Sequence, residues 1–149
     1  EFYRYMNQWM YWDIYANQTD YMMAQARELD AKAAREGVEA IAPLYGLPFP
    51  IKGTVATSDF PSSAGSGVLH TFFALEDAAM VSLLRGAHAI IAGKTNVPEF
   101  ACSLVTANYA NGRTLNPYDH RLVTCGSSGG AASAVASHLA PIALSEDTR

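Results

Sequence analysis

The chain of 149 residues is half hydrophobic, has 16% charged residues and carries a formal net charge of −4, which is typical of a globular chain able to bury one core. The mild acidity argues against a nucleic-acid partner, because no basic stripe is present to replace the counterions of phosphate groups. No run of about 18 apolar residues occurs, so we expect no transmembrane helix.

Aromatic residues dominate the beginning of the chain. Tyr5, Trp9 and Trp12 recur at spacings of four and three, which predicts an amphipathic helix that packs its aromatic face against the rest of the protein. A membrane-surface or homodimer face is an alternative, although the polar side lacks the Lys and Arg typical of interfacial helices. Asn17 begins a glycosylation sequon, a weak hint of the secretory pathway that leaves the compartment open. Because the first residue is Glu1, we expect a processed or partial product.

A second helix is predicted after Asp20. Apolar residues recur at helical spacing from Met22 to Ala33. Gly37 stands where a glycine commonly closes a helix. We therefore place leading helices in residues 1–37.

From Ile41 onward the pattern becomes mixed. Prolines and glycines interrupt the apolar run up to Ile51, which indicates short extended pieces and turns. The further predicted elements are a helix over 76–84, a buried strand over 89–92 that ends at Gly93, a small-residue helix over 129–139 and a strand over 141–144. The alternation of strands and helices predicts an α/β protein with a buried sheet, whose core begins in residues 41–149 without a clear domain boundary.

Residues that bind metals or form disulfides are sparse. Cys102 and Cys125 are too few for a disulfide framework, so we expect two free thiols. The four histidines are scattered and match no metal-ligand spacing, so no metal site is expected. Residues 93–95 resemble the end of a phosphate-binding loop, but His88 stands where that motif requires glycine, and a nucleotide site is therefore not predicted.

A lysine and a serine loop are the candidate chemical groups. Ser127 and Ser128 lie between glycines at the start of an Ala-rich helical stretch, which indicates either a flexible linker or a polar corner at a helix terminus. Lys52 ends an apolar strand, where it either reaches water or is buried. A buried lysine tends to lose its charge and becomes a competent base for a hydroxyl. The combination suggests nucleophilic chemistry by serine and lysine.

Five segments in order resemble the landmarks of the amidase signature enzymes, and the resemblance runs from about Ala24 to Arg149. The matching segments are LYGLPFPIK at 44–52, SAGS at 63–66, GKTNVPEF at 93–100, RTLNPYD at 113–119 and GSSGG at 126–130. Each segment alone is weakly specific, whereas five in the right order are highly specific.

The resemblance implies a fold and an activity. It implies one large α/β domain with a mixed sheet core covered by helices, of which this chain is the N-terminal portion. The implied activity is hydrolysis of a carboxamide C–N bond through an acyl-enzyme, without metal or organic cofactor. The implied partners are a small-molecule, lipid or peptide amide substrate and the remainder of the amidase domain. Residues 1–149 alone are then expected to be inactive.

The resemblance also assigns residues to roles. Lys52 matches the family's catalytic lysine, and Ser127 matches its relay serine, with a cis peptide bond expected between Gly126 and Ser127. The nucleophilic serine is expected two positions beyond Arg149. Thr148 and Arg149 are expected at the edge of the oxyanion hole.

The other residues of the GSSGG segment are assigned to support of the serine loop. These residues are Gly126, Ser128, Gly129 and Gly130. Ser128 is expected to face differently from Ser127 and to support the loop, not the relay.

Three departures from the family pattern keep alternatives open. Gly53 replaces the usual aspartate, Thr124 and Cys125 replace Pro-Gly before the serine loop, and Arg149 stands where a glycine is expected. An arginine at a glycine position crowds a loop whose backbone angles it resists. The alternatives are a catalytically inactive amidase-fold scaffold or interaction subunit, and an amidotransferase subunit.

Overall fold

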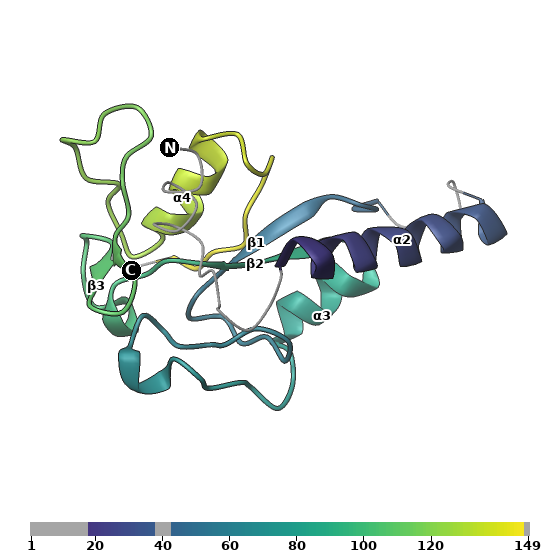
Figure 1. Cartoon of the computed structure of the whole chain (residues 1–149), viewed down its shortest axis with the longest axis horizontal. Coiled ribbons are helices and arrows are strands. Elements are labelled where there is room, and N and C mark those ends of the chain that lie inside the picture. Colours follow the sequence, from purple (N-terminus) through teal and green to yellow (C-terminus); the bar gives the residue numbers. More distant parts are fainter. Residues whose placement is uncertain (1–17, 38–42, 148–149) are drawn as a thin grey trace.

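A computed structural model describes residues 18–37 and 43–147 (Figure 1). The aromatic helix predicted near the start, the Asn17 sequon and the two residues assigned to the oxyanion hole, Thr148 and Arg149, lie outside the described residues. The division predicted between the leading helices and the core also falls on residues outside them and stays a prediction. None of the described helices is long and apolar enough to cross a membrane.

The first described helix, α2 (Gln18–Glu36), confirms the helix predicted after Asp20. Gly37 ends it with a φ of 82°, and its N–H donates to the Ala33 carbonyl over 2.9 Å. The helix lies along β2 (Ile90–Thr95), where the Gln25 side chain forms two hydrogen bonds of 3.1 Å with the N–H and C=O of Ile91. A side-chain amide thereby satisfies backbone groups at the edge of this strand.

Two parallel strands form the centre of the fold (Figure 1). Strand β1 (Pro48–Lys52) pairs with β2, and the register shifts between Phe49 and Pro50. The prediction that β2 ends at Gly93 is wrong, because the strand continues through Thr95 beside the end of β1.

The strand predicted over 141–144 is also wrong in extent. Within this segment only Leu144 pairs with β1. Its N–H donates to Pro50 O and its carbonyl accepts from Lys52 N, each over 2.9 Å. The next bond of such a ladder, toward residue 142, requires an N–H at Pro50, and proline has none.

Helix α3 (Ala79–Gly86) and the 54–62 loop bury one face of the strand pair. Phe49, Ile51 and Ile91 form a core with Val81 of α3 and Phe60 of the loop. The helix begins at Ala79, three residues later than predicted, and residues 76–78 precede it. The Asp77 carboxylate there accepts hydrogen bonds from Ser58 N and Arg85 Nε over 2.8 and 2.7 Å, which ties the loop to α3.

Helix α4 (Gly129–Ala136) contacts β1 and β2 and begins at the serine loop (Figure 1). It ends three residues earlier than predicted, because His138 has a φ of 61° and leaves the helical conformation. A small hairpin of β3 (Ala107–Asn108) and β4 (Gly112–Arg113) forms a separate antiparallel sheet.

Two glycines open α4 because backbone and hydroxyl groups approach them closely. A Cβ at Gly130 would overlap the backbone of Asn96, and one at Gly129 would overlap the hydroxyls of Thr106 and Thr124. Glycine costs a helix about 1 kcal/mol relative to alanine. The close packing of α4 on the end of β2 explains why glycine is nevertheless present.

We predict that Gly130→Ala lowers the free energy of unfolding by about 1–3 kcal/mol, since the added methyl group forces the Asn96 backbone to move. Gly86→Ala is the matched control, because Gly86 also lies in a helix and its Cβ would meet nothing within 4 Å. Denaturant unfolding of both variants measures the difference. Equal stability of the two variants would contradict the packing argument.

Candidate active site

The Lys52 side chain is fully buried at the end of β1, and its Nζ donates a 2.6 Å hydrogen bond to Ser127 Oγ. Because side chains alternate along a strand, Ile51 faces the core with Val81 while Lys52 points to the other face. The peptide bond between Gly126 and Ser127 is cis. The predicted geometry of a buried Lys52 in contact with Ser127, with a cis bond before the serine, is therefore confirmed.

Thr106 holds the loop that carries Ser127. Its hydroxyl donates to Cys125 O over 2.7 Å and accepts from Gly129 N over 3.1 Å, so one side chain joins both ends of the loop. Ser128 faces a different direction and donates to the Glu146 carbonyl over 3.1 Å. The expectation that Ser128 faces differently from Ser127 agrees with this hydrogen bond.

A carboxylate that the sequence did not single out also contacts the lysine. Glu146 Oε1 lies 3.2 Å from Lys52 Nζ and accepts a 2.7 Å hydrogen bond from Thr54 Oγ1. The Thr54 hydrogen bond and then the contact with Lys52 lower the pKa of Glu146 below its ordinary value. No sequence pattern marks Glu146. Its position two residues after Leu144, which pairs with the strand that ends at Lys52, brings it to the amine.

A second buried lysine lies in the neighbouring strand and points to the face opposite Lys52. Lys94 Nζ donates to Val55 O and lies 3.4 Å from the hydroxyls of both Thr57 and Ser62. Burial lowers the pKa of Lys94 to about 7, and the carboxylates of Asp59 and Asp77 offset part of that effect. Lys94 therefore fixes the 54–62 loop and is not part of the serine loop.

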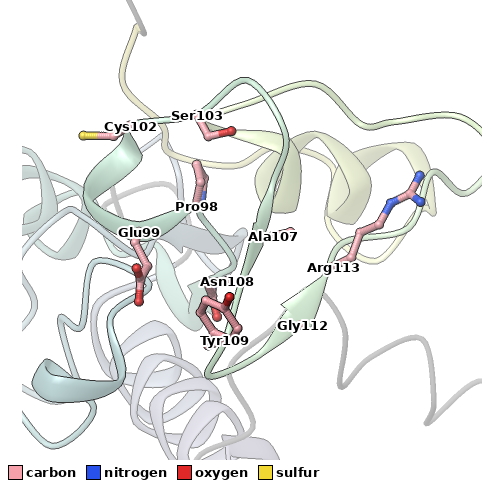
Figure 2. A pocket seen from close by; sticks show the side chains of 9 residues that line it. All are labelled: Pro98, Glu99, Cys102, Ser103, Ala107, Asn108, Tyr109, Gly112 and Arg113. Atoms are coloured by element: carbon pink, nitrogen blue, oxygen red, sulfur yellow. The ribbon is translucent and has the colours of Figure 1, made fainter.

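An open cavity of about 530 Å³ lies between the β3–β4 hairpin and the turn over 98–103 (Figure 2). Figure 2 shows Cys102 and Ser103 at one end of it and Asn108 and Tyr109 at the other. Neither Lys52 nor Ser127 lines this cavity, so the sequence-predicted pair and this hollow are separate features.

Both cysteines, Cys102 and Cys125, are free thiols, as predicted. Within residues 18–37 and 43–147, no three His, Cys, Asp or Glu side chains are grouped so as to hold a metal ion.

Comparisons with known proteins show the family to which the chain belongs. The family model described as Amidase matches residues 11–149. The chain is 43% identical over 129 residues to a glutamyl-tRNA(Gln) amidotransferase subunit of Chlorobaculum tepidum, a match that covers 87% of this chain and 26% of that protein.

Solved structures of related proteins share the fold. A peptide amidase from Stenotrophomonas maltophilia superposes with a TM-score of 0.75 at 35% identity, over 82% of this chain and 26% of its own. The corresponding glutamyl-tRNA(Gln) amidotransferase subunit from Thermotoga maritima superposes with a TM-score of 0.67 at 32% identity, over 70% of this chain and 23% of its own.

The chain belongs to the amidase signature family. Its fold is the α/β fold of that family. The chain spans about a quarter of the length of the curated relatives that it matches.

We predict that Lys94 makes stability depend on pH. Above about pH 7 the folded protein starts to release the Lys94 proton, whereas the unfolded chain keeps it up to about 10.5. The unfolded state then binds more protons, so Lys94 adds a positive slope of up to about 1.4 kcal/mol per pH unit to the free energy of unfolding in this window. Lys94→Met should remove that slope.

Unfolding of the full-length protein at a series of pH values between 7 and 10 measures the effect. Lys32→Met is the control, because it removes the same charge from α2, where Lys32 Nζ contacts His88 Nε2 over 3.0 Å. A Lys94→Met variant that keeps the wild-type slope would show that another group titrates there.

Proposed function

We propose that the protein that carries this chain hydrolyses carboxamide C–N bonds through an acyl-enzyme. The observation that supports the proposal most is the 2.6 Å contact between the buried Lys52 amine and the Ser127 hydroxyl. Such a pair supplies a base and a proton relay in one desolvated corner. Family membership supplies the reaction class.

The proposed mechanism begins with Lys52 in its neutral form. Lys52 Nζ accepts the Ser127 hydroxyl proton while Ser127 Oγ accepts the proton of the nucleophilic serine expected beyond Arg149. The nucleophile attacks the carbonyl carbon, and the proton returns through the same two groups to the departing nitrogen as the C–N bond breaks. Water then attacks the acyl ester, the relay takes its proton, and the acid leaves with the serine restored.

Residues of two loops stabilise the reacting groups in this mechanism. Backbone N–H groups near Thr148 and Arg149 form the edge of the oxyanion hole and stabilise the charge that develops on the carbonyl oxygen. The serine loop is supported against the end of β2 by the other residues of its segment, which are Gly126, Ser128, Gly129 and Gly130. We propose a small-molecule, lipid or peptide amide as the substrate, without a metal or an organic cofactor.

A role within an amidotransferase complex is the second candidate function. It is favoured by the 43% identity to a protein named as one subunit of glutamyl-tRNA(Gln) amidotransferase. The same lysine and serine serve amide cleavage in either case, and the two candidates differ in what accepts the released nitrogen. Purification of the full-length protein from its source with stably associated subunits favours the second candidate, whereas turnover of simple amides by the isolated protein favours the first. An inactive scaffold is the third alternative, based on Gly53 and Arg149.

We predict that Lys52→Ala in the full-length protein lowers kcat by at least about 100-fold with little change in KM, because a general base acts mainly in the transition state. Ser127→Ala should have a comparable effect. Ser128→Ala should lose less, since its hydroxyl bonds to the Glu146 carbonyl. Lys32→Ala is the control for loss of a lysine at a distant helix. Steady-state kinetics on an aryl amide measures these effects, and turnover that survives Lys52→Ala would reject the mechanism.

We also predict that the polypeptide of residues 1–149 alone does not turn over aryl amides or esters, because the proposed nucleophile is not among these residues. The assay compares this polypeptide with the full-length protein at equal concentration. Turnover by the short polypeptide that disappears in Lys52→Ala would show that the nucleophile has been assigned to the wrong segment.

A further inference from the structure

Glu146 contacts three parts of the structure around the proposed relay. Its carboxylate lies 3.2 Å from Lys52 Nζ and accepts a 2.7 Å hydrogen bond from Thr54, directly after β1. Its backbone carbonyl accepts from Ser128, in the serine loop. Nearly half of the Glu146 side chain is exposed, whereas Lys52 is fully buried. Glu146 therefore contacts both the buried amine and the solvent.

The groups around Lys52 differ in charge. The register places Thr95 of β2 beside Lys52, and the serine loop presents the neutral hydroxyl of Ser127. Asp147 follows Glu146 on the same segment. The Glu146 carboxylate is in ion-pair contact with Lys52, with Oε1 at 3.2 Å from Nζ. A carboxylate at this distance favours the ammonium form of a lysine.

Lys94 is a second buried lysine of the strand pair, and its closest contacts differ from those of Lys52. It is as fully buried as Lys52, and its Nζ contacts a carbonyl and hydroxyls. Burial lowers the pKa of Lys94 to about 7. Both lysines are fully buried in adjacent strands. Lys52 Nζ contacts the Glu146 carboxylate directly, whereas the Asp59 and Asp77 carboxylates offset only part of the effect of burial on Lys94.

We propose that Glu146 is a positioning residue for the relay, which pairs with Lys52 and holds it as an ammonium in the resting protein. The inference rests on the proposed function for its catalytic consequence. An ammonium at Lys52 donates to Ser127 Oγ and accepts nothing, so it must first release one proton to solvent before it serves as a base. Glu146 thus sets the pH at which the relay begins to operate.

The test is the pH dependence of kcat/KM for an aryl amide in the full-length protein. Glu146→Gln keeps the shape and an oxygen acceptor for Thr54 but removes the charge. We expect the rise of activity toward alkaline pH to move to lower pH by at least about one unit, which corresponds to an increase of about tenfold well below the wild-type midpoint. Glu146→Asp keeps the charge, so its pH profile of kcat/KM should have the wild-type midpoint.

Glu36→Gln is the matched control, because it removes the same charge at the exposed end of α2. It should leave the midpoint unchanged. An unchanged midpoint in Glu146→Gln, together with an inactive Lys52→Ala, would overturn the inference and leave the proposed function standing. Activity that survives Lys52→Ala would instead reject the proposed function.

A second measurement does not depend on turnover. Nitrogen-15 labelling of lysine side chains allows the Lys52 titration to be followed by NMR, with the signal assigned by its loss in Lys52→Arg. Glu146→Gln should lower the titration midpoint of Lys52 and leave that of Lys94 unchanged. Identical Lys52 midpoints in the wild type and in Glu146→Gln would overturn the inference whatever the protein's activity.

Discussion

Removing the Lys52 amine from water costs free energy unless its protons find acceptors within the protein. Two acceptors meet this need, the Ser127 hydroxyl and the Glu146 carboxylate, and they come from segments far from Lys52 in the sequence. Lys52 is the last residue of β1, and Ser127 lies just before the start of α4. Leu144 pairs with β1, and Glu146 follows it two residues later. The buried Lys52 nitrogen therefore depends on the packing of all three segments for its hydrogen-bond partners.

The strand pair separates two lysines with different surroundings. Lys52 ends β1 on the face where the serine loop begins, and Lys94 in β2 points to the opposite face and holds the 54–62 loop. Side chains alternate between the two faces of an extended strand. Because Lys94 lies beside Ile51 in the register, Lys52 and Lys94 point to opposite faces. A charged pair on one face and an amine among neutral oxygens on the other give the two lysines different roles in the same small sheet.

Much of the fold follows from sequence patterns, and the exceptions have local causes. Gly37 marked the end of α2 correctly, because a left-handed conformation there favours glycine. The paired part of segment 141–144 was overestimated, since hydropathy does not register the N–H that Pro50 lacks. The residue patterns suggested chemistry by a lysine and a serine, and the family resemblance assigned Lys52 and Ser127 to one site. Glu146 was missed because a half-exposed carboxylate has no pattern until its three-dimensional neighbours are known.

The amide of Gln25 has a consequence for how the sheet is built. It bonds to both the N–H and the C=O of Ile91, as the backbone of an adjacent strand would. At Ile91 the place of a further strand is therefore already occupied by a helix side chain. A further strand could pair with Ile91 only by displacing this amide, so at that residue α2 covers the edge of the strand pair opposite the one where Leu144 pairs.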